Sequence, residues 1–163
     1  MPVAFEFTVD VPRFAQANAS RFLTILSEEM QAASLQGAER IQTLAQTLAP
    51  VAFGALRDDI LVDTIPAAYP ILGGAHVFTG DRTLGYARPV EFGSRPHWVS
   101  VRHLQAWADL KGINVYAVRW SIATKGTRPQ PFFNPAVEAI FGQLPQLLTE
   151  GLSRAIYRMH FAA

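Results

Sequence analysis

The stretch that decides the fold is residues 13–48, RFAQANASRFLTILSEEMQAASLQGAERIQTLAQTL, which contains no proline. One set of positions recurs largely in steps of three and four residues, the spacing of a single helix face. We therefore predict one long amphipathic helix, with Gly37 as its weakest point because glycine lowers helix stability. The positions on this face are Phe22, Ile25, Glu29, Ala33, Ile41, Leu44, Ala45 and Leu48.

The predicted length of this helix raises a question about its surroundings. At 1.5 Å per residue, roughly 36 residues span about 54 Å. A compact chain of this size has a radius of gyration of about 15 Å. Either the helix breaks near Gly37, or another subunit covers part of its apolar stripe.

Strand patterns lie on both sides of this helix. Residues 3–11 alternate strictly between apolar and polar positions, which predicts a strand with one buried face, ended by Pro12. After Pro50 ends the helix, residues 56–65 also read as a strand. We expect residues 75–79 and 85–92 to form a hairpin, with Tyr86, Arg88, Val90 and Phe92 on one face of its second arm.

Capping signals predict two short helices in the second half of the chain. One covers residues 101–110, with Ser100 as its cap and Gly112 as its stop, and the other is capped by Asn114 and runs to Lys125, where Gly126 stops it.

The last helix is predicted to begin at Asn134 and Pro135, a cap followed by proline at the first helical position. We expect Pro145 to kink it. The predicted fold class is thus α+β, with the long N-terminal helix and the C-terminal helix packed on a small antiparallel sheet and two short helices between. No linker divides the chain, so residues 1–163 form one expected domain, with residues 1–12 as a strand arm.

Composition excludes several classes of protein. The chain has 163 residues, of which 50% are apolar, and it has no cysteine, so a disulfide scaffold and cysteine chemistry are excluded. The most apolar stretch, residues 65–78, is too short to span a bilayer and contains prolines and glycines, so no membrane association is expected. No basic-then-apolar leader opens the sequence, and we expect an intracellularly made globular protein.

Charge is balanced overall but not along the chain. The net charge is +1, which argues against a general nucleic-acid binder. Residues 82–128, however, carry eight basic residues against two acidic ones, a charge of +6, and hold all three tryptophans. This stretch is either a solvated basic face or a contact surface.

The candidate metal ligands do not form a site by their spacing. His97 and His103 are six residues apart, which a helix does not bring to one face. Asp58, Asp59 and Asp63 are best interpreted as a solvated strand edge.

Two further catalytic patterns are equally weak. Asp109 and Lys111, with Glu91 as a conceivable third ligand, match half of a metal-dependent nuclease signature, but on a predicted helix. No glycine elbow precedes Ser94 or Ser100, the serines that lie near histidines. We therefore predict no catalytic, cofactor-binding or metal-binding residues and no enzyme activity.

Two segments echo one another: Gly93-Ser94-Arg95-Pro96-His97 and Gly126-Thr127-Arg128-Pro129-Gln130. Each is a glycine turn that places an arginine before a rigid proline. They are either two loops that grip a partner or chance similarity of turn chemistry.

Three stretches in order resemble a family of bacteriophage neck and tail-completion proteins. They are LAPVAFGALR at residues 48–57, YARPVEFGSRPH at 86–97 and GTRPQPFFNPA at 126–136. They match the family's "APxxxGxLR", "YAxxVEFGT" and "PFxxPA" segments, and the likeness extends over residues 20–160. Phe53 and Pro89 depart from the pattern, and Pro89 predicts an edge or bulged strand. The strand at residues 3–11 has no counterpart in the family.

The resemblance implies a structural part of a long-tailed phage virion. Family members form a sixfold or twelvefold ring at the head–tail junction, between the portal, adaptor or stopper proteins and the tail tube or terminator, and genomic DNA passes through it. The implied role is neck formation or tail completion without catalysis or cofactors. A small DNA-binding or DNA-processing protein is the alternative function.

A ring needs two different surfaces on each subunit, and aromatic and arginine residues are enriched at interface centres. The hypothesis is that the long helix and the two echoing loops supply these surfaces. The alternative is that the phenylalanines fill the core. The basic stretch would face either DNA or an acidic neighbour, and we favour the neighbour. The candidate interface residues are Phe92, Arg95, His97, Trp98, Arg128, Phe132 and Phe133.

Overall fold

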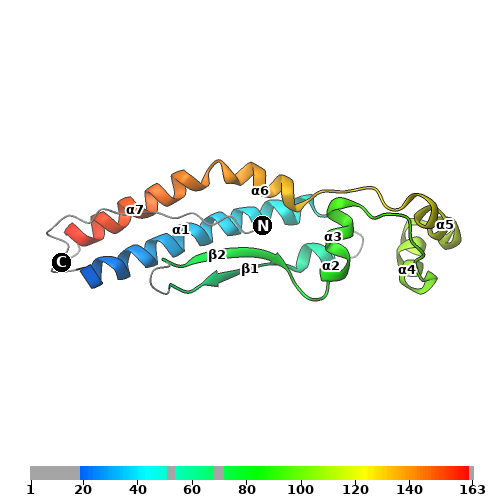
Figure 1. Cartoon of the computed structure of the whole chain (residues 1–163), viewed down its shortest axis with the longest axis horizontal. Helices are drawn as coiled ribbons and strands as arrows, with labels where there is room; N and C mark the ends of the chain where they lie inside the picture. The colour runs from blue at the N-terminus through cyan, green and yellow to red at the C-terminus, as the bar shows by residue number, and fades with distance from the viewer. Residues whose placement is uncertain (1–18, 51–53, 68–71, 162–163) are drawn as a thin grey trace.

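The computed structural model describes residues 19–50, 54–67 and 72–161, so the strand predicted at residues 3–11 lies outside the described residues. The described chain is a mixed α+β fold with long helices at both ends and a small antiparallel sheet, as predicted (Figure 1). Its elements are α1 (Ala19–Leu48), α2 (Ala55–Asp58), β1 (Ile60–Ile65), β2 (Gly74–Thr79), α3 (Leu84–Phe92), α4 (Val101–Lys111), α5 (Val115–Lys125), α6 (Phe133–Phe141) and α7 (Leu144–Phe161).

Helix α1 is the spine of the molecule. It runs unbroken for 30 residues, about 45 Å at 1.5 Å per residue, so the alternative that the helix breaks near Gly37 is wrong. Gly37 is buried, and a Cβ there would lie 2.6 Å from Leu144 Cδ2. The missing side chain thus serves close packing of another helix against α1 and does not interrupt it.

Helices α6 and α7 cover one side of α1, and the sheet covers the other (Figure 1). Close approach of α7 depends on small residues. A Cβ on Gly151 would lie 2.8 Å from Met30 Cε and 3.1 Å from the carbonyl oxygen of Glu29. The two helices therefore approach each other closely at Gly151.

The C-terminal helix differs from the prediction in two details. Its first part begins at Phe133, so Asn134 and Pro135 lie in the first turn and Asn134 is not the cap. The chain then ends α6 at Phe141 and restarts at Leu144, where Pro145 stands in the first turn of α7. Backbone N–H groups in the first turn of a helix have no carbonyl partner within the helix, so proline, which lacks this group, fits there. Pro145 therefore marks a helix start and not a kink.

The sheet pairs different strands from those predicted. β1 and β2 are antiparallel, with Leu61 opposite Phe78 and Asp63 opposite His76. Residues 56–58 of the strand predicted at 56–65 belong instead to the short helix α2. The predicted hairpin of residues 75–79 with 85–92 is wrong, because residues 84–92 form α3, with Pro89 inside that helix.

A buried carboxylate explains why α3 forms. Asp59 accepts hydrogen bonds from Thr83 N at 3.0 Å and from Thr83 Oγ1 at 2.8 Å. Both residues are buried, so the prediction of Asp59 as a solvated strand edge is wrong. The contact holds the residue that precedes α3 and satisfies its backbone N–H, which favours helix at a segment whose own pattern favours strand.

Two apolar clusters lie at opposite ends of the α1 spine. The first joins α1, α2, β1, α3 and α6, and the second joins the start of α1 to α7. The buried members of the first are Ala45, Ala49, Leu56, Ile60, Ala87, Phe132 and Ala136. Those of the second are Ile25, Leu26 and Ala155.

An ion-pair network ties α7 to α1 near the second cluster. Glu29 accepts from Arg154 Nε at 2.8 Å and from Arg158 Nη1 at 2.9 Å, and Arg158 also binds Glu28 at 3.0 Å. The Glu29 side chain is 14% exposed. The hydrogen bond from Arg154 is the main cause that lowers the pKa of Glu29, and burial opposes it.

We expect Glu29→Gln to destabilise the chain by about 1–2 kcal/mol at pH 7. Since the pKa of Glu29 is lowered on folding, its stabilisation is complete above the pKa of the unfolded chain and is lost as the pH falls through the folded value. The difference between the two free energies of unfolding, measured in urea, should therefore shrink as the pH falls below about 4. Glu39→Gln, at an exposed position of the same helix, is the control and should change stability by less than about 0.5 kcal/mol at either pH.

Candidate interaction surface

The two echoing segments lie side by side at one end of the molecule. Ser94 N donates to Thr127 O at 3.2 Å, and Thr127 N donates to Ser94 O at 3.1 Å. Thr127 Oγ1 also donates to Ser94 Oγ at 2.9 Å. These residues occupy equivalent places in the two segments, so the similarity that the sequence contains corresponds to an antiparallel pairing between them.

Both segments begin with a glycine that the pairing requires. Gly93 has φ 75° and Gly126 has φ 73°. A Cβ on Gly93 would lie 2.6 Å from Thr127 O, and one on Gly126 would overlap Ser94 O. The two strands of chain therefore cross at a distance that only glycine allows.

A buried carboxylate anchors this crossing to the core. Glu91 Oε2 accepts from Phe132 N at 2.8 Å and from Phe133 N at 2.9 Å, while Oε1 accepts from Asn134 N at 2.9 Å. These N–H groups lie at the start of α6, where the helix itself offers them no carbonyl partner and its dipole stabilises a negative charge. Both oxygens of Glu91 thus hold the backbone at the start of α6.

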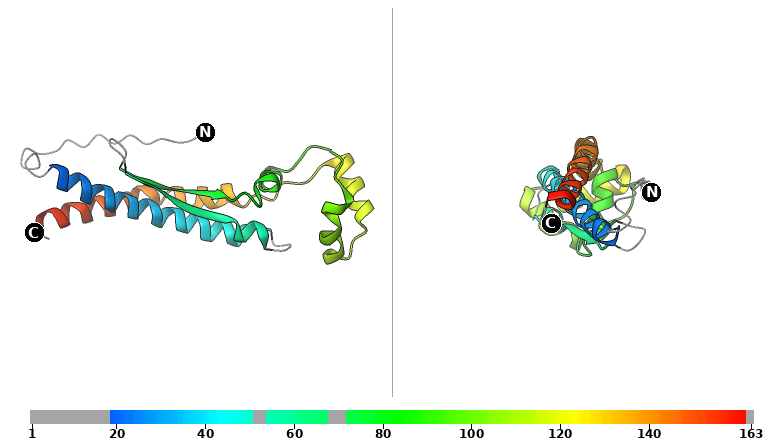
Figure 2. Two further views of the ribbon diagram at one scale, coloured as in Figure 1. Left: turned by 90° about the horizontal axis from the view of Figure 1, so that it is seen from below. Right: turned by 90° about the vertical axis from the view of Figure 1, so that its left-hand side faces the viewer.

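Residues 93–131 form an arm that stands beyond this anchor, and the other described residues form the body. The arm contains α4 and α5, which pack on each other (Figure 2). The predicted helix ends are confirmed at Gly112 and Gly126, and Asn114 Oδ1 accepts from Tyr116 N and Ala117 N. Ser100 precedes α4 as predicted but makes no side-chain cap.

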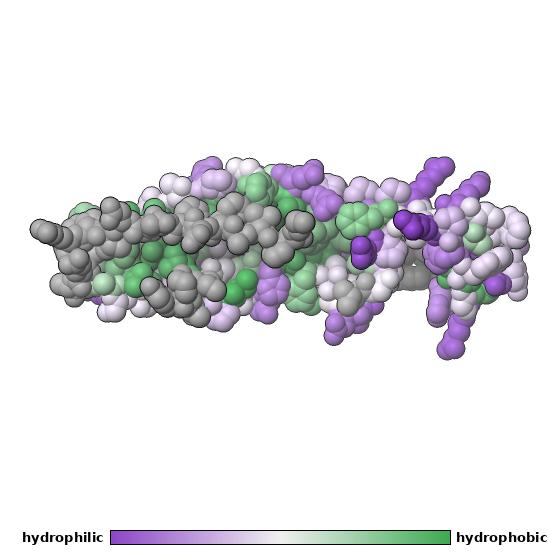
Figure 3. Space-filling view, in the orientation of Figure 1, coloured by the Kyte–Doolittle hydropathy of each residue, from purple (hydrophilic) through white to green (hydrophobic). Residues whose placement is uncertain are grey.

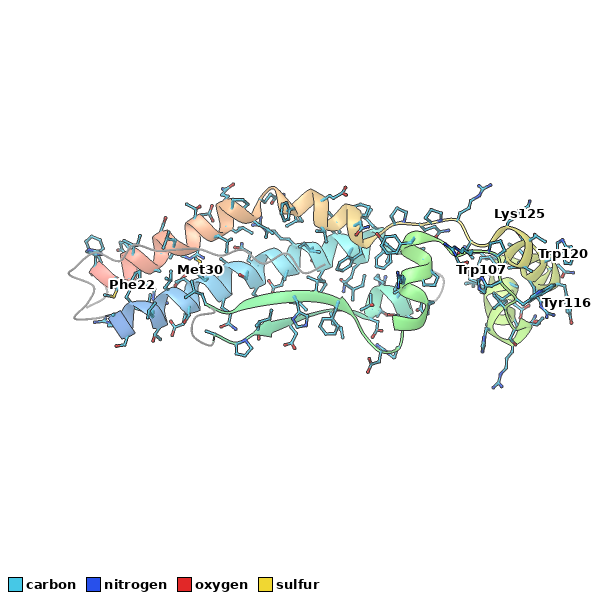
Figure 4. The ribbon with its side chains drawn as sticks, viewed as in Figure 1. Phe22, Met30, Trp107, Tyr116, Trp120 and Lys125 are labelled. Atoms are coloured by element: carbon cyan, nitrogen blue, oxygen red, sulfur yellow. The ribbon has the colours of Figure 1, made fainter. Side chains whose placement is uncertain are left out.

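The arm exposes a patch of large aromatic side chains. Trp98, Tyr116 and Trp120 are 65%, 66% and 64% exposed, and Figure 4 shows Tyr116 and Trp120 together on α5. The rings of Trp98 and Trp120 meet edge to face at 6.2 Å. The guanidinium of Arg119 lies 5.0 Å from the centre of the Trp98 ring, a cation–π contact that fixes an arginine beside the patch.

The arm and the body carry opposite net charge. Six basic residues and Asp109 give the arm +5, whereas the described body has seven basic and ten acidic residues, a net charge of −3. Long hydrophilic side chains project from the arm end of the molecule (Figure 3). The basic stretch found in the sequence is therefore concentrated at this end of the fold.

The predicted interface residues divide into two groups. Arg95, His97, Trp98 and Arg128 are exposed on the arm, and Phe92 is exposed at its base. His97 Nδ1 lies 2.8 Å from Arg95 O, which orders its loop.

The two adjacent phenylalanines follow the core alternative. Phe132 is 1% exposed and lies in the core, and Phe133 packs partly buried against the same cluster.

Sequence reasoning missed the contribution of α5. Tyr116, Arg119 and Trp120 belong to the patch, yet the sequence marks them only as part of a basic stretch. The available signal was that the apolar residues of 115–125 do not form one stripe, as a helix with a single buried face would.

Two other features, a metal-binding cluster and a membrane-spanning helix, are absent from the described ranges. Residues 19–50, 54–67 and 72–161 hold no group of three or more histidine, aspartate or glutamate side chains that could bind a metal ion. No helix among them is long and apolar enough to cross a membrane.

Comparison with known protein families, with curated proteins and with solved structures gives no match for this chain.

Proposed function

We propose that this chain is a structural subunit of the head–tail junction of a long-tailed bacteriophage. In this role, copies of the chain form a ring, sixfold or twelvefold, that completes the neck or tail and lets genomic DNA pass. Portal, adaptor or stopper proteins lie on the head side, and the tail tube or terminator lies on the other. The role requires no catalysis and no cofactor, and it places the protein in the virion after assembly in the host cytoplasm.

The observation that carries the proposal is the meeting of all three resembling segments at one place. Ala49 and Leu56 from the first, Ala87 from the second, and Phe132 and Ala136 from the third belong to one buried cluster. Segments far apart along the chain thus form a single structural unit, which supports interpreting them together and not as three chance matches.

The same unit holds the arm. Glu91 of the second segment binds the backbone of the third at Phe132, Phe133 and Asn134. The arm therefore leaves the body between two fixed points, and its exposed aromatic and arginine side chains are of the kind found at interface centres. A projection that is fixed at its base and carries such a patch favours a protein that assembles over one that acts alone.

The purified full-length protein provides the test. We expect sedimentation and negative-stain electron microscopy to show closed rings of one size at micromolar concentration, as head-to-tail contacts between identical subunits produce when they close. A protein that stays monomeric at all concentrations contradicts the proposal.

The same sample distinguishes the DNA-binding alternative, which the basic arm favours. Monomers that bind DNA at low salt, with affinity that falls steeply as salt increases, would support that alternative.

A further inference from the structure

The sheet presents an apolar face that the described body leaves open. Ile60 is buried and Val77 packs on the core, so these residues face α1. Neighbours along each strand face the other way. On that outer face Leu61, Ile65 and Phe78 are 38%, 42% and 36% exposed.

The outer face has an acidic border. Asp63 lies on it between Leu61 and Ile65, and its side chain is exposed. Asp81 follows β2 and is also exposed, whereas Asp58, which precedes β1, is exposed but ion-paired with Arg57 at 2.9 Å. The face therefore combines an apolar centre with carboxylates, whereas the arm combines an aromatic centre with arginines and lysines.

The arm cannot supply this cover within its own chain. It lies beyond α3 at one end of the long axis, whereas the strands run back along α1 toward the other end (Figure 1). Among the described helices, α1 packs on both strands and α2 packs on β1. The two complementary surfaces of one molecule are thus separated and point to different neighbours.

We propose that the arm of one copy docks on the outer face of the β1–β2 sheet of the next copy. Trp98 and Trp120 contact the apolar centre formed by Leu61 and Phe78, and the basic residues of the arm face the carboxylates of the body. The occupant is a second copy because the net charges of arm and body, +5 and −3, are complementary. A nucleic acid does not fit this face, because the face is apolar and bordered by carboxylates. The contact joins two different surfaces, so it is head-to-tail, and repeated copies of it form a ring when the rotation between neighbours closes. This inference rests on the proposed ring and names the surfaces that close it.

Two complementary variants test the contact directly. The arm variant carries Trp98→Ala and Trp120→Ala, and the sheet variant carries Leu61→Thr and Phe78→Thr, which keep residues that favour strands. Each should fold, as judged by circular dichroism and thermal unfolding, and self-associate at least about 30-fold more weakly than the unchanged protein. Ile156→Ala, on the exposed side of α7, is the control and should form rings as the unchanged chain does.

Mixing the two variants gives the decisive result. The intact arm of the sheet variant can dock on the intact sheet of the arm variant, and no further contact can follow. We therefore expect a 1:1 heterodimer in native mass spectrometry and no ring. Folded variants that each still form rings, or a mixture that stays monomeric while the unchanged chain forms rings, would overturn the docking and leave the proposed function standing. An unchanged chain that never associates would contradict both.

Discussion

Glu91→Gln should lower the free energy of unfolding by about 2–4 kcal/mol, with a melting temperature lower by roughly 5–15 °C. The carboxylate is buried and accepts three backbone N–H groups at 2.8–2.9 Å. An amide has one acceptor oxygen, and its NH2 group would face donors. At least one buried N–H is then left without a partner, next to a helix start that favours negative charge.

The matched control is Glu138→Gln, which makes the same chemical change on the exposed side of α6. We expect it to change stability by less than about 0.5 kcal/mol. Urea unfolding followed by far-ultraviolet circular dichroism measures both variants. Equal stability of the two proteins would mean that Glu91 does not hold the start of α6, and the arm would have no anchor at this point.

The elements that could be predicted are those whose signals are local. The long helix α1 follows from its spacing, and α5 follows from Asn114, whose side chain caps it, and from Gly126, which ends it. In each case the residues that determine the element lie within it or next to it.

Elements that depend on distant residues could not be predicted. Residues 85–92 alternate in the manner of a strand, and they form a helix because Asp59, 24 residues before Thr83, holds the residue that precedes it. Similarly, Asn134 and Pro135 are a good local start for a helix, yet Glu91 binds the backbone from Phe132 onward and the helix begins earlier. A carboxylate that reaches across the fold gives no sign of its target in the sequence.

The candidate site shows the same division. The glycine and arginine loops were identifiable as similar, but their pairing joins Ser94 and Thr127 across 33 residues. Local similarity could not distinguish this contact from chance. For Phe132, composition alone could not decide between a core and an interface role, because aromatic residues are common in both.

Gly126→Ala should be the other strongly destabilising change, because it combines two separate costs. At φ 73° and ψ −161° the backbone is in a region used almost exclusively by glycine, which costs about 1–3 kcal/mol for any other residue. The new methyl group would also overlap Ser94 O. That atom belongs to the backbone and cannot rotate away, so the pairing with Thr127 must open. We expect a total loss of about 3–5 kcal/mol.

Two other glycines separate these costs. Gly112 has φ 64° and ψ 31°, and a methyl group there would meet no atom within 4 Å, so Gly112→Ala should lose only about 1–2 kcal/mol from backbone strain. Gly142 has φ −64° and equally open space, so Gly142→Ala should be neutral or more stable by up to about 1 kcal/mol. Amide hydrogen exchange at Ser94 and Thr127 should become fast in Gly126→Ala alone, because only that variant opens the crossing. If Gly126→Ala matched Gly112→Ala in both stability and exchange, the two loops would not be paired, and the arm would lack the fixed base from which it reaches a neighbour.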